Sequence, residues 1–444
     1  MSEDRRGPLS WIEIIRLGLV QTALGAIVVL TTSTLNRVMV VELALPAMLP
    51  GALVGLHYAV QLSRPRWGHG SDMGGARTPW IIGGMAVLAL GGVLAAAATA
   101  LAAAAVWPGV ALAVFAFILI GAGVGASGTS LLALLATDVA PARRAPAASI
   151  TWIMMIMGFA VTAGAAGGFL DPFTLTRLIA VTACVCALAF LVCLAAIWGV
   201  ERRGRSARAP ARTAGQRSFK AAIAEVWNEP KARRFTVFVF IAMLAYSTQD
   251  LILEPFSGLV FNMTPGQSTQ LAGMQHGGVL LGMIAVAILG ARLSGGAFGR
   301  RQHWVVGGCL ASSVALAAIA AASLAGPGWP LAPTVFALGV ANGAFAVAAI
   351  GAMMGLAGAD GPGREGVRVG LWGAAQAIAF ALGGFLGAAA IDLTRALLDD
   401  VAVAFAVVFA AEAVLFLAAA RLALSVEDAE PEPDHAGELA GGTP

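Results

Sequence analysis

Charged side chains are scarce in this sequence. Only 11% of its 444 residues are Asp, Glu, Lys or Arg, whereas a soluble globular domain carries about 25%. The mean hydropathy is +0.85, and 59% of the residues are hydrophobic. These values exclude a soluble globular protein and predict an all-α polytopic membrane protein. The partner that such a composition requires is the lipid bilayer, and we expect no nucleic-acid partner.

Cysteine and catalytic motifs are also sparse. The four cysteines all lie inside apolar segments and have no His or Cys at metal-ligand spacing: Cys184, Cys186, Cys193 and Cys309. We therefore interpret them as core- or lipid-facing thiols and expect no metal site. The sequence contains no phosphate-binding Gly-rich loop with Lys-Ser/Thr, no nucleophile elbow, no zinc-helix motif and no paired Asp-rich prenyl-binding box. We expect no catalytic residues and do not expect an enzyme.

Long apolar runs fill most of the chain. A membrane-spanning helix needs about 20 apolar residues, and this criterion predicts twelve transmembrane helices. They lie near 17–40, 45–65, 79–104, 107–136, 146–170, 174–199, 234–261, 268–291, 303–325, 331–357, 366–391 and 400–424.

Basic residues are distributed very unevenly between the connecting segments. If the N-terminus is cytoplasmic, 24 of the 27 Lys and Arg residues fall on the cytoplasmic side, and only Arg37, Arg177 and Arg395 fall outside. Such a bias is a strong positive-inside signal. It predicts a multi-pass protein of the bacterial inner membrane with both termini in the cytoplasm.

One basic stretch, 200–232, divides the chain into two halves. We predict an N-terminal six-helix half (1–199), this basic cytoplasmic linker, a C-terminal six-helix half (233–424) and a disordered acidic tail (425–444). The linker is interpreted as an inter-half loop with topogenic charge, and attraction to anionic lipid headgroups is compatible with it. An internal repeat supports the division, because Gly167-Gly-Phe-Leu170 is matched by Gly383-Gly-Phe-Leu386, and Leu175-Thr-Arg177 by Leu393-Thr-Arg395.

The loop from Trp67 to Trp80 carries the most specific pattern. Gly68, Asp72 and Arg77 are spaced as in the loop after the second helix of major facilitator superfamily transporters, which this loop resembles. The resemblance implies a major facilitator fold in which Asp72 and Arg77 latch the cytoplasmic ends of the helices. Asp138 and Arg143, at the base of the fourth predicted helix, are their expected partners in this cytoplasmic gating loop.

Further segments narrow the resemblance to one family. The segments 36–42 (NRVMVVE), 55–58 (GLHY), 64–68 (RPRWG) and 77–84 (RTPWIIGG), taken together, resemble the PucC/LhaA family. The resemblance implies a protein of the photosynthetic membrane that hands bacteriochlorophyll to light-harvesting polypeptides or organises its late synthesis. One branch of this family is described as a bacteriochlorophyll synthase chain of about this mass. Because no prenyl-binding motif is present, we expect at most a non-catalytic partner of that synthase.

Two histidines are candidate pigment ligands. His57 and His276 each lie in the second predicted helix of their half. A neutral imidazole inside the membrane can bind the magnesium of bacteriochlorophyll axially. The alternative is that each ring is simply hydrogen-bonded between helices, as intramembrane histidines commonly are. Gln61, one turn after His57, gives that position a polar neighbour.

Four charged residues form a candidate intramembrane network. Asp250 and Glu254 are four residues apart and share one face of a helix. Carboxylates in the membrane are costly unless they are paired, protonated or hydrated. Because helices 1 and 7 face each other in this superfamily, we expect Arg37 to pair with Asp250 or Glu254. A proton-coupling role for Glu42 or Glu254 is the alternative interpretation.

Three functions remain open from the sequence. The first is the pigment-handling role, with bacteriochlorophyll as the bound molecule. The second is a proton-coupled secondary transporter of a small solute, which needs a polar central cavity; the scarcity of charges at mid-membrane disfavours it. The third is a non-transporting scaffold for antenna assembly, which sequence alone does not separate from the first.

Overall fold

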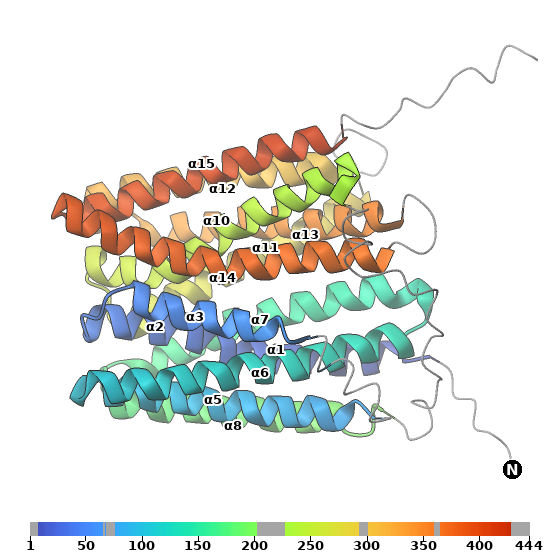
Figure 1. Cartoon of the computed structure of the whole chain (residues 1–444), viewed down its shortest axis with the longest axis horizontal. Helices are drawn as coiled ribbons and strands as arrows, with labels where there is room; N and C mark the ends of the chain where they lie inside the picture. The colour runs from blue at the N-terminus through green and yellow to red at the C-terminus, as the bar shows by residue number, and fades with distance from the viewer. Residues whose placement is uncertain are drawn as a thin grey trace, which may run out of the picture.

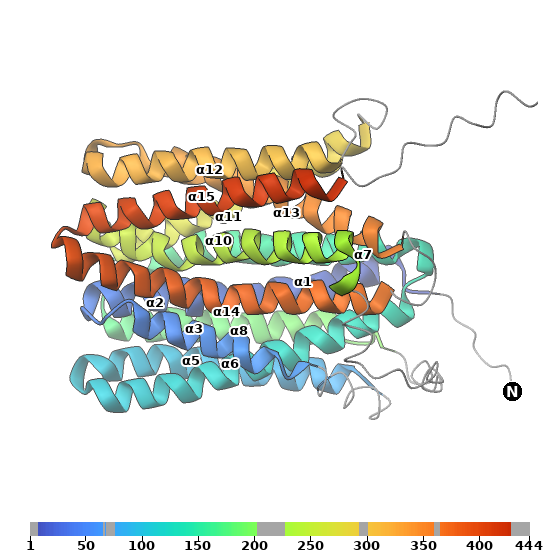
Figure 2. The same cartoon turned by 45° about the horizontal axis from the view of Figure 1, so that its top comes forward.

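The computed structural model describes residues 8–64, 67, 76–201, 227–292, 301–358 and 365–427. Every regular element in these ranges is helical, and together they form one bundle (Figures 1 and 2). The longer helices are α1 (Trp11–Val29), α3 (Met48–Gln61), α5 (Thr78–Ala104), α6 (Val106–Asp138), α7 (Arg144–Leu170), α8 (Leu175–Ile197), α10 (Pro230–Phe261), α11 (Pro265–Arg292), α12 (Arg301–Ala325), α13 (Leu331–Gly358), α14 (Glu365–Leu398) and α15 (Val401–Glu427).

The first membrane segment begins with a reciprocal cap and ends in wide turns. At its start, the Glu13 backbone N–H donates to Ser10 Oγ at 3.3 Å and the Ser10 N–H donates to Glu13 Oε2 at 2.8 Å, a capping box that satisfies two free amides. After α1 the helix continues through the π-helical segment η1 (Leu30–Thr34), the short α2 (Leu35–Arg37) and the π-helical η2 (Val38–Glu42). Such π-helical turns are frequent at functional sites.

The prediction of an all-α multi-pass membrane protein is confirmed. Each of the twelve predicted segments corresponds to a helix, and eleven segments among the described residues are long and apolar enough to cross a membrane. The exception is α3, which has 14 residues, fewer than the roughly 20 that a span needs. Two boundaries also differ from the prediction: α10 begins at Pro230, inside the predicted linker, and α15 continues to Glu427, inside the predicted tail.

The two halves repeat one packing pattern. In the first half α1 packs on α7 and α8, α5 packs on α6 and α8, and α3 packs on α6. In the second half α10 packs on α14 and α15, α12 on α13 and α15, and α11 on α13. Each set encloses its own apolar core. This is the arrangement that parallel six-helix repeats give.

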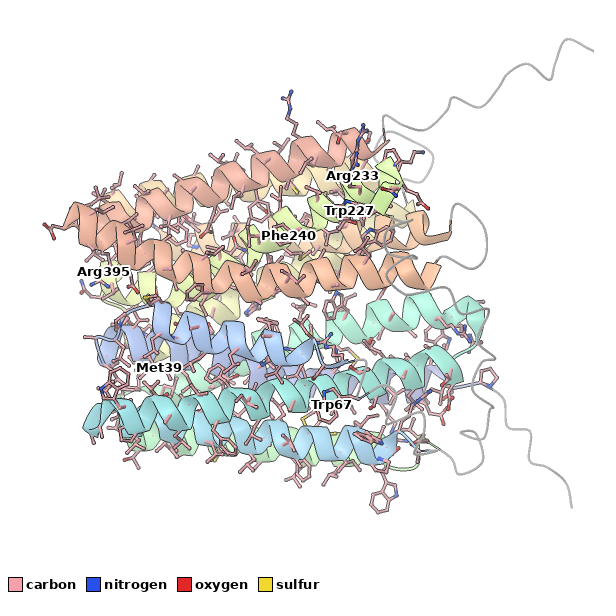
Figure 3. All side chains as sticks on the ribbon, viewed as in Figure 1. Met39, Trp67, Trp227, Arg233, Phe240 and Arg395 are labelled. Atoms are coloured by element: carbon pink, nitrogen blue, oxygen red, sulfur yellow. The ribbon has the colours of Figure 1, made fainter. Side chains whose placement is uncertain are left out.

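The bundle has two distinct ends. We call the end where α1 begins and α15 finishes the terminal face, and the opposite end the far face (right and left in Figure 1). In Figure 3, Arg395 lies toward the far face, whereas Trp227 and Arg233 lie toward the terminal face. Which face meets the cytoplasm stays a prediction from the Lys and Arg distribution.

Glycines bring the halves into contact along two seams. One seam is formed by α3 and α14, the other by α7 and α11. At the second seam Gly164 and Gly273 meet so closely that a Cβ on Gly273 would lie 2.6 Å from the Gly164 nitrogen. Small residues permit such approach between membrane helices. At the first seam a Cβ on Gly55 of α3 would lie 3.1 Å from the Ala381 carbonyl oxygen of α14, so both seams depend on close backbone contact.

We expect Gly273→Ala to lower stability by about 1–3 kcal/mol, because an added methyl group overpacks a close seam. Gly277, one turn further along α11, is the matched control, since a Cβ there would meet nothing within 4 Å. Gly277→Ala should be neutral or slightly stabilising, because alanine favours a helix over glycine by up to about 1 kcal/mol. Thermal unfolding in detergent measures both variants, and equal midpoints would contradict this account of the seam.

Candidate functional site

A buried carboxylate joins the two halves. Glu254 on α10 is 1% exposed, and hydroxyl groups surround its carboxylate. Ser33 of η1 donates to Oε1, while Ser268 and Thr269 of α11 each lie 3.3 Å from Oε2. Because a buried carboxylate without hydrogen bonds is very costly, donors from both halves stabilise this position together.

Two further hydrogen bonds cross the same region. Thr34 of η1 lies 3.1 Å from Thr269, hydroxyl to hydroxyl. Asn36 donates its amide to the Leu251 carbonyl of α10 at 2.5 Å. The wide turns of the first segment thus face α10 and α11, and we call Ser33, Thr34, Glu254, Ser268 and Thr269 the hydroxyl cage.

Arg37 has a different acidic partner from the one predicted. Its Nη1 donates to Glu42 Oε1 at 2.5 Å, and its Nη2 donates to the Met263 carbonyl at 2.6 Å. The predicted pairing with Asp250 or Glu254 is replaced by this ion pair within one segment. The physical reason is the π-helical winding of η2, whose i to i+5 spacing brings Glu42 alongside Arg37.

A depression of about 610 Å³ lies beside this ion pair at the far face. Its lining includes Arg37, Glu42 and Asp171 from the first half, with Asn262 and Thr264 from the second. Gly258 also lines it, and a Cβ there would lie 3.0 Å from Arg37 Nη2. The absence of a side chain at Gly258 therefore makes room for the guanidinium group.

Asp250 lies one turn from Glu254 and also points to α11. Its Oδ1 accepts from Gln275 Nε2 at 3.4 Å, and the residue is partly exposed. Nearby, three aromatic rings connect the halves. The Phe380 ring of α14 lies 5.3 Å from the Tyr58 ring of α3 and 6.0 Å from the Tyr246 ring of α10. The four-residue spacing thus places both carboxylates on one face, where each meets a different set of partners.

The two candidate pigment ligands are both enclosed by protein. His57 is 1% exposed, its Nε2 lies 2.9 Å from Gln61 Nε2, and its ring packs edge-on against Tyr58 at 4.7 Å. His276 is 4% exposed, and its ring lies 5.1 Å from that of Phe159 on α7. The Nδ1 atom of each histidine has no hydrogen-bond partner in the described structure. His276 therefore lies directly at the seam between α7 and α11, whereas His57 is also held by its own helix.

Part of the predicted gating loop lies outside the described residues, including Gly68 and Asp72. Arg77 is described: its backbone N–H donates to the Glu201 carboxylate at 2.7 Å, and its Nη1 donates to Thr137 Oγ1 at 2.5 Å. Thr137 in turn lies 2.9 Å from Asp138 Oδ1. The structure therefore brings Arg77 and Asp138 to one hydroxyl group at the end of α6. The Arg143 guanidinium instead lies 5.4 Å over the Trp11 ring.

Two aspartates that the sequence analysis did not select form reciprocal caps. Asp392 of α14 accepts from the backbone N–H groups of Ala47 and Met48, at the start of α3, at 3.0 and 2.8 Å. Asp171, which follows α7, accepts from the Thr264 hydroxyl at 2.6 Å and the Gly266 N–H at 3.3 Å, at the start of α11.

Each half thus supplies a carboxylate to a helix N-terminus of the other half. An anion there satisfies free amides and is favoured by the helix dipole. Asp171 directly follows the first repeated Gly-Gly-Phe-Leu segment and Asp392 lies six residues after the second, so the repeat is the one sequence signal that could have drawn attention to them. We call the two contacts the reciprocal aspartate caps.

The comparisons with known proteins agree with this architecture. The family model described as PUCC protein matches residues 34–430, which is most of the chain. The chain belongs to the PucC protein family. This confirms the resemblance read from the sequence. A relative from Rhodobacter capsulatus, named "Bacteriochlorophyll synthase 44.5 kDa chain", is 56% identical, with 94% of this chain and 96% of the relative covered.

More distant PucC relatives and a solved structure extend the comparison. "Protein PucC" from Rhodobacter capsulatus is 30% identical, with 94% of this chain and 92% of that protein covered. Among solved structures, an inward-facing bacterial homologue of the human lysosomal transporter Spinster matches with a TM-score of 0.62 at 17% identity, covering 93% of this chain and 96% of that one. At that identity the likeness shows the fold alone, and it confirms the predicted major facilitator fold of this PucC family member.

We expect loss of both reciprocal aspartate caps to loosen the far face. Asp171→Ala and Asp392→Ala should each cost about 0.5–2 kcal/mol, the usual range for a lost cap. Their combination should also speed maleimide labelling of a Thr269→Cys reporter, a buried position between the halves. The reporter is placed in a Cys184→Ala background, because Cys184 is the exposed native thiol.

Asp400 provides the matched control, since its carboxylate caps α15 within its own half by accepting from the Val403 N–H at 3.1 Å. Asp400→Ala should lower stability by a similar amount without changing the labelling rate. Equal labelling in the Asp171/Asp392 double variant and the parent protein would show that these caps do not hold the halves together.

Proposed function

We propose that this protein handles bacteriochlorophyll in the photosynthetic inner membrane of a bacterium, as a non-catalytic component. Its task is to assist late pigment synthesis beside bacteriochlorophyll synthase or to deliver pigment into light-harvesting complexes. The observation that carries the proposal is the 56% identity, over nearly the whole length of both chains, to a relative named as a bacteriochlorophyll synthase chain. The PucC family membership supports the same conclusion.

The seam between α7 and α11 offers the better position for a pigment ligand. Bacteriochlorophyll carries a magnesium ion that takes an axial nitrogen ligand, and a neutral imidazole supplies one. Both histidines keep an unpartnered Nδ1, and His276 contacts the first half through the Phe159 ring of α7. Parting α7 from α11 would uncover it, whereas His57 would also have to lose its contact with Gln61. We therefore place His276 ahead of His57 as the candidate ligand.

The absorption spectrum of the purified protein tests this assignment. Protein from a bacteriochlorophyll-making host, extracted in mild detergent, should carry the pigment, and His276→Ala should lose most of it. His57→Ala should lose less, and His303→Ala, at an exposed position of α12, should retain the wild-type amount. Retention of pigment in both His57→Ala and His276→Ala would exclude these histidines as ligands.

A colourless wild-type protein would contradict stable pigment binding and favour a non-transporting scaffold for antenna assembly. Deletion of the gene separates the two forms of the main proposal. Loss of a light-harvesting complex with normal pigment synthesis would indicate delivery, whereas accumulated chlorophyllide would indicate a role beside the synthase.

The hydroxyl cage favours a second candidate, a proton-coupled secondary transporter of a small solute. Glu254 is fully enclosed between the halves and hydrogen-bonded from both, so a change in its protonation would alter contacts between them. Buried intramembrane carboxylates of this kind commonly mark proton relays.

Substitution of Glu254 separates a structural from a coupling role. Glu254→Leu leaves buried hydroxyls without their acceptor and should lower stability by about 1–3 kcal/mol, whereas Glu254→Gln should retain most of the stability because the amide oxygen still accepts. If the protein couples transport to protons, Glu254→Gln should fold and abolish proton movement across proteoliposome membranes. Unchanged proton movement in that variant would rule out Glu254 as the coupling residue.

A further inference from the structure

Seven buried side-chain polar atoms in the described C-terminal half lack a hydrogen-bond partner. Two are His276 Nδ1 and Trp372 Nε1, and the other five lie on α10, α13 and α15. These five belong to three buried side chains: Nε2 and Oε1 of Gln249, Nδ2 of Asn342, and both carboxylate oxygens of Glu412. Gln249 and Asn342 are 0% exposed and Glu412 is 2% exposed. Buried polar atoms in folded proteins nearly always have a hydrogen-bond partner. Such a group of orphaned atoms therefore calls for an explanation.

Packing places Asn342 opposite Glu412. Phe345 of α13 and Phe416 of α15 meet edge-on at 5.8 Å. Both helices run from the far face toward the terminal face (Figure 1). Asn342 and Glu412 each lie about one helical turn before their phenylalanine, on the same face of their helix. They are therefore level with each other in the bundle.

Helix α12 joins these two helices at the same level. Ser312 donates to Asn342 Oδ1 at 2.8 Å, and the adjacent Ser313 donates to the Ala413 carbonyl, next to Glu412, at 2.8 Å. One pair of successive residues thus contacts both α13 and α15. The Asn342 oxygen is satisfied by this contact, but its Nδ2 group is not.

Gln249 approaches the same space from α10. Phe256 of α10 packs against Phe409 of α15 at 5.0 Å, and the two helices run in opposite directions. Gln249 lies two turns from Phe256 on the same face, toward the terminal face, and Glu412 lies one turn from Phe409 in that direction. Asn342 and Glu412 therefore face the same space between α12, α13 and α15, and Gln249 of α10 lies about one turn from them toward the terminal face.

The N-terminal half shows that the fold does not need polar residues here. Asn342 lies as far from the start of α13 as Phe117 lies from the start of α6. Glu412 lies as far from the start of α15 as Cys186 lies from the start of α8. Both of these counterparts are buried and apolar. At these two positions the polar side chains are a property of the C-terminal half.

We propose that Gln249, Asn342 and Glu412 form a closed binding site for a small cluster of water molecules. The orphaned set includes two amide N–H₂ donors as well as carboxylate and amide oxygen acceptors. A metal cation satisfies acceptors only, whereas water both donates and accepts. A buried water typically makes about three hydrogen bonds, and these groups supply that number. Shared water would link four helices of this half.

Hydroxyl-radical footprinting by X-ray radiolysis of the full-length protein in detergent tests the site. Radicals formed from bound water modify neighbouring side chains even where bulk solvent has no access. Phe345 and Phe416, which flank the proposed water, should be oxidised. Phe117, buried at the matched position of the other half, should remain unmodified and serves as the internal control.

Two variants sharpen the test. Glu412→Gln should retain the labelling of Phe345 and Phe416, because an amide still binds water. The double variant Glu412→Leu/Asn342→Leu should lose it, because an apolar lining stays dry. Should the double variant fail to fold, the wild-type and Glu412→Gln patterns still decide the question.

Two results would overturn the proposal. The first is wild-type Phe345 and Phe416 that are as unreactive as Phe117, which would mean a dry core in which the side chains bond one another directly. The second is a wild-type thermal midpoint that rises with sodium chloride but not with choline chloride, combined with a Glu412→Gln midpoint that responds to neither salt. That dependence would identify a cation site instead.

Discussion

The need to hydrogen-bond a buried carboxylate shapes the centre of this protein. Glu254 sits where lipid and apolar side chains exclude water, and an unpaired charge or an unbonded carboxyl group there is severely unfavourable. Its donors come from η1 in one half and from the start of α11 in the other. The association of the halves is therefore not a matter of apolar packing alone. It includes a polar contact that neither half can complete by itself, surrounded by close glycine seams that fix its geometry.

Much of the fold follows from the sequence, because its strongest signals are physical requirements of the membrane. Long apolar runs set the helices, and the internal repeat anticipates halves that pack alike. The prediction is poorest where local geometry departs from a regular α-helix. The ion pair between Arg37 and Glu42 depends on a π-helical turn, and nothing in residue spacing read at 3.6 residues per turn places those two groups together. Helix ends are similarly imprecise, as α10 and α15 extend into segments whose composition indicates linker and tail.

The residues of the candidate site were likewise predicted only in part from the sequence. Residue type and depth were enough to select Glu254, Asp250 and His276, since ionisable or polar groups in apolar segments are conspicuous. Their partners were not predictable, because Ser33, Ser268 and Phe159 are ordinary residues until the helices are assembled. Asp171 and Asp392 were missed for another reason. Each lies near a helix end, where a carboxylate is unremarkable in sequence, and only the crossing of α3 with α14 and of α7 with α11 gives it a helix N-terminus to cap.

The hydrogen bonds described above between the halves all lie toward the far face, from the hydroxyl cage to the reciprocal aspartate caps. Such an arrangement would favour rotation of the halves about the far face over their separation there. If the halves tilt against each other about these contacts, the helix ends at the terminal face move furthest, while the hydrogen bonds near the far face change little. A tilt of this kind would let a bulky, flat molecule enter between the halves from the terminal face without breaking the contacts at the far face. It also confines the polar part of the contact between the halves to the far end of the bundle.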